Sequence, residues 1–468
     1  MEKFTKGLTY SFTFALLVLG IASPALPASR KFQLRNGDRV LFYGDSITEQ
    51  RYYPVAIETY VRTRFPDLKV KFRNSAVGGA TVTGNWTAPV DLSLKRDVFS
   101  FKPNIVTIML GMNDGRYRPM DAAIFDTYKN GYEHIIKSLQ AHLPGVTIVL
   151  IEPTPWDDIT QTPSYPHNPN HEPGGYDSVL RRYSAFVRKL GAQDHLTVVD
   201  FHTPLVKLMK EAEKKDPALA GKIIPKRIHP GPSTELVMAQ ALLKAWNAPA
   251  LVSDVQINAK ASSIKRSDNT AATNLSLENG KVSWTQTDKA LPYPIMTLHS
   301  TKWPQFPPDP FGREDTIFWP MPPLDSPAIN PVAALVTKLT GMYQALDSEM
   351  LQASGLKAAS YTLGIDGHPV GTFSKEQLAH GINLAQHDTP MMDQSYKVLS
   401  LVWHRVDIRF YGWRGVQVAL RKDKTPGIQE AVDNLLTVLN REQNDLVAKA
   451  HAAAQPQPHH YELTPVAQ

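Results

Sequence analysis

Residues 31 to about 250 alternate between short apolar runs and longer segments in which apolar residues recur with a helical period. We predict strands at the apolar runs, which are residues 39–43, 70–72, 105–110, 146–151 and 196–199. We predict helices between them, from Pro54 onward and at residues 122–139, 176–190 and 233–246. Strands that alternate with helices form a parallel sheet joined by right-handed crossovers. The alternation therefore predicts an α/β fold.

The chain has 468 residues, more than one hydrophobic core normally organises, so we expect two domains. We place the α/β domain at residues 29–250 and an accessory region at residues 251–468. In the accessory region we predict short strands at 251–287, an ordered proline-rich wrap at 292–331 and a helix at 332–354. We then predict a hairpin at 360–373 with its turn at Asp366-Gly367, a helix start at Ser374, long helices at 391–410 and 428–454, and a frayed tail from residue 455.

Residues 1–28 have the pattern of a secretory signal peptide. Lys3 and Lys6 precede a short apolar run at residues 11–22, and Ala25 and Ala28 offer small residues for cleavage. The run is short for a membrane span, although an uncleaved anchor is the alternative interpretation. We therefore expect a periplasmic or secreted bacterial protein with no stable membrane span after cleavage of the signal.

Composition excludes several classes of function. The chain lacks cysteine, which rules out disulfides, a thiolate nucleophile and cysteine-ligated metal, and suits a bacterial periplasm. The net charge of +6 falls to +5 without the signal segment, and no basic run stands out. Binding to nucleic acid is therefore not indicated.

Polar residues stand directly after two predicted strands. Ser46, in Gly44-Asp45-Ser46, follows the first strand, and Asn113 follows the strand at 105–110. His229 lies in a later loop rich in proline. Open α/β folds bind ligands at the carboxyl ends of their strands, where such groups converge. A serine nucleophile, a histidine base and an amide donor for an oxyanion are what ester hydrolysis needs.

Each of these residues also has an ordinary structural explanation. Ser46 suits a helix cap, Asn113 suits an Asx-turn, and a single loop histidine is often incidental. Gly78-Gly79 after the second strand lets the backbone approach a ligand closely, or forms a simple turn.

The four blocks together, in this order and spacing, resemble the SGNH (GDSL-type) hydrolase family over residues 38–247. The resemblance implies a flavodoxin-like three-layer α/β/α fold with a five-stranded parallel sheet in the order 2-1-3-4-5, and no metal or other cofactor. It implies Ser46 as nucleophile and His229 as base. The Ser46 amide, the Gly79 amide (in preference to Gly78) and the Asn113 side chain would form the oxyanion hole.

One position departs from the family pattern. The family has aspartate three residues before the catalytic histidine, and this chain has Lys226. That carboxylate fixes the histidine tautomer and stabilises the imidazolium. Either His229 works in a dyad, or another acid such as Asp200 substitutes, or activity is impaired. Asp200, at the end of the fifth strand, is favoured as a cap of the helix segment that follows near Pro204, so we do not count it as catalytic.

We expect a secreted serine esterase that removes acyl groups, in particular acetyl, from a small-molecule or carbohydrate ester. Trp86, Tyr117 and Tyr176 would line a sugar cleft or simply pack. The alternatives are a lipid or thioester acylhydrolase, and a glycan-binding protein impaired by Lys226.

Overall fold

The computed structural model describes residues 31–161, 175–295 and 331–466. The predicted signal segment and nearly all of the proline-rich wrap lie outside these residues. Within them, no helix combines the length and the apolar character needed to cross a bilayer.

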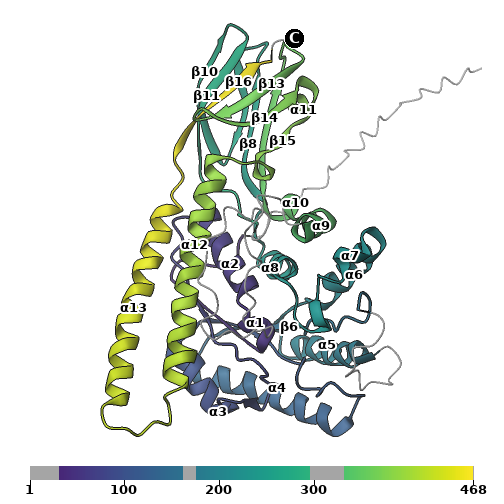
Figure 1. Cartoon of the computed structure of the whole chain (residues 1–468), viewed down its shortest axis with the longest axis vertical. Helices are drawn as coiled ribbons and strands as arrows, with labels where there is room; N and C mark the ends of the chain where they lie inside the picture. Colours follow the sequence, from purple (N-terminus) through teal and green to yellow (C-terminus); the bar gives the residue numbers. More distant parts are fainter. Residues whose placement is uncertain (1–30, 162–174, 296–330, 467–468) are drawn as a thin grey trace, which may run out of the picture. The chain divides into compact units, whose positions relative to one another are not determined.

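A five-stranded parallel sheet organises the first half of the chain (Figure 1). Its strands are β1 (Arg39–Gly44), β2 (Lys71–Asn74), β5 (Ile105–Met109), β6 (Thr147–Ile151) and β7 (Thr197–Val199). They lie in the order β2-β1-β5-β6-β7 and every neighbouring pair is parallel. The predicted flavodoxin-like order is confirmed. Every residue of β5 is buried, because helices cover both faces of the sheet.

Helices flank the sheet on two sides (Figure 1). They are α1 (Ser46–Glu49), α2 (Tyr52–Arg64), α3 (Val90–Ser93), α4 (Ala122–His142), α5 (Gly175–Gln193), α6 (His202–Lys215), α7 (Pro217–Ala220) and α8 (Pro232–Ala245). Residue chemistry sets their ends: the side chain of Asp121, for example, accepts hydrogen bonds from the Ala123 and Ile124 amides and starts α4. The sequence indicated a helix segment near Pro204, where α6 lies, but did not predict α7.

Most strands of the second half form two sheets that share one hydrophobic core. The strands are β8 (Leu251–Asn258), β9 (Ser263–Asp268), β10 (Thr270–Glu278), β11 (Lys281–Asp288), β12 (Ser348–Ser354), β13 (Ser360–Ile365), β14 (His368–Ser374), β15 (Ile382–Asn383) and β16 (Pro458–Pro465). One sheet has the order β10-β11-β16-β13-β14 and the other β15-β12-β8-β9. Trp284, Tyr361 and Tyr461 of the first sheet and Leu351 of the second are buried in the shared core.

Two predictions for this region are wrong. Residues 348–354 form strand β12 between β15 and β8 rather than the end of a helix, because alternate residues there are buried. The tail is not frayed: β16 lies between β11 and β13, so Tyr461 and Leu463 are fully buried.

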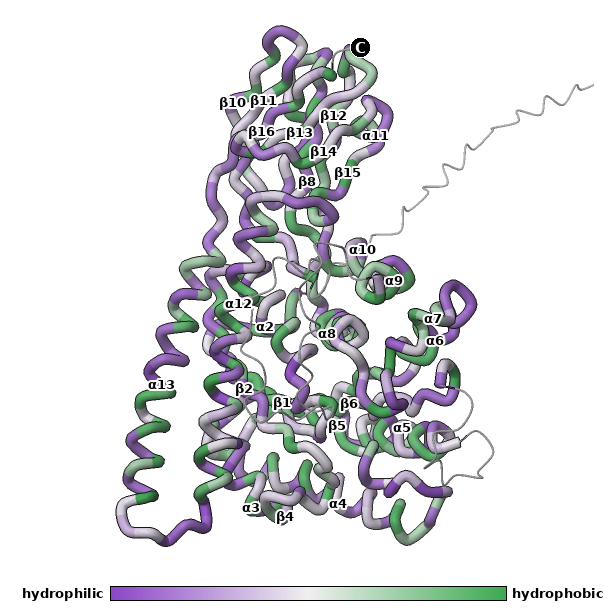
Figure 2. The backbone as a smooth tube through the Cα atoms, viewed as in Figure 1, coloured by the Kyte–Doolittle hydropathy of each residue, from purple (hydrophilic) through white to green (hydrophobic). Residues whose placement is uncertain are grey.

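The other helices of the second half join the core of the parallel sheet. They are α9 (Pro331–Thr340), α10 (Met342–Leu346), α11 (Lys375–His380), α12 (Pro390–Tyr411) and α13 (Ile428–Ala453). The exception is α11, which packs on the smaller sheets, and α10 also contacts β12 of those sheets. Apolar residues of α9, α10 and α12 belong to the same buried cluster as the parallel sheet. The long α13 packs along α12 and alternates between hydrophobic and hydrophilic residues (Figure 2).

Helix α12 is fixed to α2 by buried charges as well as by apolar contacts. Arg51 pairs with Asp407, and Arg405 pairs with Glu58, which also accepts hydrogen bonds from Arg62. Buried pairs of this kind are costly to break, because the remaining charge is left without a partner. The accessory region thus reaches the α/β domain through its helices, while the domain boundary near residue 250 stays a prediction.

Candidate active site

Ser46 begins α1 immediately after β1 in a turn that only glycine permits. A Cβ on Gly44 would lie 2.4 Å from Thr48 Oγ1 and 2.9 Å from the Met109 carbonyl oxygen. The Asp45 side chain accepts a hydrogen bond of 3.0 Å from the Ile47 amide and caps α1. Burial raises the pKa of Asp45 to about 7. The cap of this helix is therefore Asp45, and the Ser46 hydroxyl is left for another partner.

That partner is His229. Its Nε2 lies 2.8 Å from Ser46 Oγ, although 183 residues separate the two in sequence. Burial, assisted by the charge of Lys226, lowers the pKa of His229 to about 4. The ring is therefore neutral at neutral pH, and a neutral ring with its proton on Nδ1 accepts the Ser46 hydroxyl proton at Nε2.

The structure supplies no aspartate to this pair. No carboxylate of the described residues hydrogen-bonds to His229. Asp200 Oδ1 instead accepts a hydrogen bond of 2.8 Å from the Thr203 amide at the start of α6. Lys226 is exposed and adopts a left-handed backbone conformation, with φ of +56°. Within the described residues, His229 therefore contacts Ser46 without a carboxylate on its other side.

Arg227 fixes the backbone of the loop that carries His229. Its guanidinium donates to the Asp157 carbonyl and to Asp158 Oδ1, both at 2.9 Å, and also to the Gln161 carbonyl. Its own carbonyl accepts from the Asp157 amide at 3.1 Å. Planar guanidinium groups suit such multiple contacts, and this one is almost completely buried. The clamp was not visible in the sequence, because its partners come from a separate loop after β6.

The two candidate glycines differ in how their amides are used. The Gly78 amide donates a hydrogen bond of 2.7 Å to Glu49 Oε2. The Gly79 amide has no acceptor among the described residues, and Gly79 has φ of +72°, which glycine adopts without strain. A free amide is what an oxyanion hole requires, so the geometry favours Gly79 over Gly78, as the family resemblance does.

Asn113 is held on both sides of its amide. Its Nδ2 donates to the Ala80 carbonyl at 3.1 Å, and its Oδ1 accepts from the Tyr117 hydroxyl at 2.7 Å. An amide nitrogen carries two hydrogens, so one remains for a ligand. Tyr117 thus orients Asn113 instead of lining a sugar cleft. The two residues are four apart in sequence, but this spacing alone did not reveal the contact. The neighbouring Asp114 accepts from the Val82 amide at 2.9 Å and ties the loop after β2 to β5.

Of the three aromatic residues considered for sugar binding, only Trp86 is exposed, with 62% of its surface accessible. Tyr176 is fully buried, and its hydroxyl donates to the Met112 carbonyl at 2.7 Å. The half-buried Tyr117 ring packs on Tyr176 and Trp156 with centroid distances of 5.2 and 5.7 Å. Tyr176 is therefore a packing residue, and Trp86 is the aromatic candidate for contact with substrate.

The accessory region reaches this site through the π-helix Gly412–Val418, which follows α12. Arg414 of that helix lies 2.7 Å from Glu49 Oε1, and the other Glu49 oxygen holds the Gly78 amide. Trp413 Nε1 donates to Asp97 Oδ1 at 3.1 Å. The second half of the chain therefore supports the glycine turn beside Ser46.

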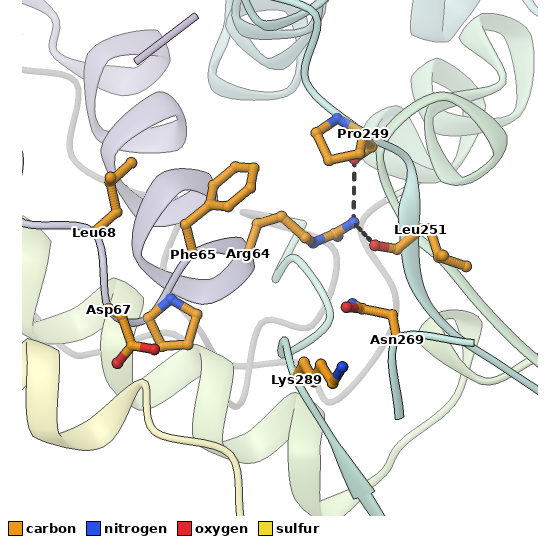
Figure 3. Close-up of a pocket in the computed structure, with 9 residues that line it drawn as sticks. Arg64, Phe65, Asp67, Leu68, Pro249, Leu251, Asn269 and Lys289 are labelled. Atoms are coloured by element: carbon orange, nitrogen blue, oxygen red, sulfur yellow. Dashed lines mark hydrogen bonds between the residues drawn. The ribbon is translucent and has the colours of Figure 1, made fainter. Parts of the chain in front are cut away.

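Two pockets differ in their relation to this site. One, with a volume of about 570 Å³, has Gly79 in its wall. The other, of about 510 Å³, contains none of the candidate residues (Figure 3). There Arg64 donates to the carbonyls of Pro249 and Leu251, at 3.2 and 2.7 Å, and anchors the chain where it enters β8. The described residues contain no cluster of three or more histidine or acidic side chains suited to a metal ion.

Comparisons with known proteins point to one family. Residues 42–234 match the GDSL-like lipase/acylhydrolase family. An acetylxylan esterase of Geobacillus stearothermophilus is 23% identical over 232 residues, which is 45% of this chain and 95% of that protein. The solved structure of a gut microbial diltiazem-metabolizing enzyme has a TM-score of 0.76 at 22% identity, covering 92% of this chain and 98% of that one. The last similarity shows that the fold of both halves recurs together.

Proposed function

We propose that Ser46 and His229 carry out ester hydrolysis in this chain. Residues 42–234 match the GDSL-like lipase/acylhydrolase family, and this match, together with the acetylxylan esterase relative, identifies the chain as an ester hydrolase. The observation that carries the proposal is the 2.8 Å contact between Ser46 Oγ and the neutral His229 ring. An uncharged imidazole nitrogen within hydrogen-bond distance of a serine hydroxyl is how that hydroxyl is activated for attack.

In the proposed reaction, Ser46 Oγ attacks the ester carbonyl while His229 Nε2 takes its proton. The negative charge that develops on the carbonyl oxygen is held by the Ser46 and Gly79 amides and by Asn113 Nδ2. The proton on His229 then passes to the leaving alcohol, and the acyl group stays on Ser46. Water, deprotonated by His229, attacks the acyl-enzyme; as the bond between the acyl carbon and Ser46 Oγ breaks, His229 returns the proton to Oγ and the acid is released.

We further propose a carbohydrate ester, in particular an acetyl ester, as substrate, and export to the periplasm or beyond. Threonine and asparagine side chains and the exposed Trp86 surround the pocket next to Gly79. Hydroxyl, amide and aromatic groups suit a sugar, whereas a long acyl chain needs an apolar wall. The acetylxylan esterase among the relatives supports the same substrate class. Export rests on the sequence pattern of residues 1–28.

The test is Ser46→Ala, with Ser100→Ala as the matched control because Ser100 is an exposed serine on the same domain. Ser46→Ala should lose at least about 10³-fold in kcat on 4-nitrophenyl acetate, since the nucleophile is removed while the oxyanion donors remain. Ser100→Ala should match the wild type. Turnover by purified, folded Ser46→Ala at the wild-type rate would refute the mechanism.

A further inference from the structure

The pocket next to Gly79 has walls from both halves of the chain. On one side lie the Gly79 turn and the short hairpin of β3 (Gly84–Asn85) and β4 (Ala88–Pro89), with Trp86 in its turn. On the other side lie Arg421 and Lys422, from the segment that joins the π-helix to α13. The pocket begins at a proposed oxyanion donor, so a group bound in it belongs to the same substrate as the ester.

The charge of this pocket is one-sided. Arg421 and Lys422 are its charged lining residues, and no acidic side chain lines it. One N–H group of Arg421 donates a hydrogen bond to the Val418 carbonyl. Neither Arg421 nor Lys422 forms an ion pair with a described residue. Arg414 close by differs, because Glu49 balances its charge. Two cations without a counterion beside a pocket attract an anionic group of the ligand.

The hairpin presents Trp86 rigidly at the edge of the same pocket. A Cβ on Gly84 would lie 2.6 Å from the Ala88 carbonyl oxygen, and Asn85 Oδ1 accepts from the Thr87 amide at 2.9 Å. The Arg414 guanidinium lies 4.5 Å from the centroid of the Trp86 ring, yet most of the ring remains exposed. A large aromatic ring held open in this way is a surface on which a sugar ring packs.

We propose that this pocket binds an acidic sugar, so that the ester hydrolysed at Ser46 is carried by a carbohydrate with carboxylate groups. The sugar ring packs on Trp86, and its carboxylate is held by Arg421 and Lys422. Thr81 and Thr83 offer hydroxyl groups for its remaining oxygens. This inference rests on the proposed esterase function and narrows its substrate.

The experiment compares acetylated oligogalacturonides with acetylated xylo-oligosaccharides of equal length, using kcat/KM of the purified full-length protein. The variant is Arg421→Gln/Lys422→Gln. The matched control is Lys424→Gln, which removes an exposed charge from the same segment but outside the pocket. A second probe is unacetylated trigalacturonate, whose binding to Ser46→Ala is measured by calorimetry and needs no turnover.

The wild type should prefer the acidic substrate, and rising NaCl should increase its KM, because exposed ionic contacts are screened. The double variant should lower the ratio of acidic to neutral kcat/KM by about tenfold through KM, as expected for lost charge-assisted hydrogen bonds. It should also weaken trigalacturonate binding, and Lys424→Gln should keep the wild-type ratio. Trp86→Ala should weaken both oligosaccharides, because ring packing does not depend on charge.

Equal effects of the double variant on both substrates, or an equal effect of Lys424→Gln, would overturn the acidic-sugar site. So would a wild type without preference for the acidic substrate. Hydrolysis of 4-nitrophenyl acetate separates the two levels: if it persists while the preference is absent, only this inference fails. If the wild type hydrolyses no ester, the proposed function fails as well.

Discussion

His229 faces a positive charge where hydrolases of this family have a negative one. Burial, together with the Lys226 ammonium, holds the pKa of His229 at about 4, well below the usual 6.5. The ring is thus ready to accept a proton from Ser46 at neutral pH, but the imidazolium that forms afterwards is not stabilised by a carboxylate of the described residues. The substitution therefore favours the resting state of the base and disfavours its charged state.

The pH dependence follows from this. Since His229 must be unprotonated to act, kcat/KM should fall only as the pH drops through about 4, not through 6.5. The charge of Lys226 is the smaller of the two causes of the lowered His229 pKa. Lys226→Gln removes it and should therefore raise the midpoint of the pH profile, while burial keeps the midpoint below 6.5. Lys226→Asp should move it further. The measurement is a pH–rate profile on 4-nitrophenyl acetate, and an unchanged midpoint in both variants would contradict the assigned role of Lys226.

Lys226→Asp should also raise kcat at neutral pH, by about twofold to tenfold. This is far below the roughly 10⁴-fold that a well-placed aspartate contributes in a triad. The left-handed backbone at residue 226 accommodates aspartate, but the side chain at this position is exposed, so water would screen a carboxylate there. A loss of activity in Lys226→Asp together with inactive Asp200→Ala would instead assign the acid to Asp200.

The side-chain amide of Asn113 can stabilise the oxyanion only if its Nδ2 group points toward the carbonyl oxygen of the substrate. Asn113→Ala should lower kcat by about 10² to 10³, the usual effect of removing one oxyanion donor. Tyr117→Phe keeps the ring packing and removes only the hydroxyl that holds Asn113 Oδ1. It should lower kcat by about tenfold with little change in KM, which corresponds in free energy to the loss of one hydrogen bond. A change in KM alone would assign Tyr117 to substrate binding.

At the scale of elements, the π-helix after α12 supports a turn in the other half of the chain. Arg414 holds Glu49, Glu49 holds the Gly78 amide, and the next amide is the proposed donor of Gly79. Burial raises the pKa of Glu49 while Arg414 opposes that rise. Without the arginine, the carboxylate would tend to take up a proton and lose its grip on the turn.

Arg414→Gln should therefore lower kcat by about tenfold with a smaller change in KM, because a lost charge-assisted hydrogen bond loosens the donor and not the binding pocket. Arg414→Lys should restore part of the loss. Arg405→Gln is the control, since Arg405 also holds α12 on α2 through a buried pair with Glu58 but does not touch the site. Both glutamine variants should lower the melting temperature. Equal kcat in the two would show that Arg414 only stabilises the fold.

At the scale of the whole molecule, the described residues form two hydrophobic cores, and these do not correspond to the first and second halves of the sequence. Helices α9, α10 and α12 contribute to the core of the parallel sheet, while β8–β16 surround the other. The last strand, β16, closes the second core from the far end of the chain. The same arrangement over nearly the whole chain recurs in the diltiazem-metabolizing enzyme, so the two halves form a shared architecture.

This arrangement predicts that the second core can be weakened without touching the first. Leu463→Ala in β16 removes a fully buried side chain between β11 and β13 and should cost about 2 to 5 kcal/mol of stability. Val466→Ala, at an exposed position just beyond the strand, should cost far less. The check is urea denaturation, with kcat measured below the transition. A loss of activity in folded Leu463→Ala would mean that the second core acts on the site directly.

The parallel sheet could be predicted from the sequence because it depends on local pattern, and the family resemblance singled out Ser46, Gly79, Asn113 and His229 as the candidate site. Apolar runs and helical periods specify a parallel sheet, and its topology brings the ends of the strands together. The hairpin turn at Asp366-Gly367 and the two long helices α12 and α13 were predicted for the same reason, since turn chemistry and periodicity are local.

The tertiary structure decided which residues meet where no local sequence pattern connects them. The pairing of Ser46 with His229, the Arg227 clamp, the orientation of Asn113 by Tyr117 and the Arg414–Glu49 pair all depend on how loops from different strands meet. The tail was mispredicted for a related reason. Its residues have weak strand character, and β16 forms because its neighbours β11 and β13 offer unpaired edges and a buried core. Sequence specifies which groups are present, and packing determines which of them meet.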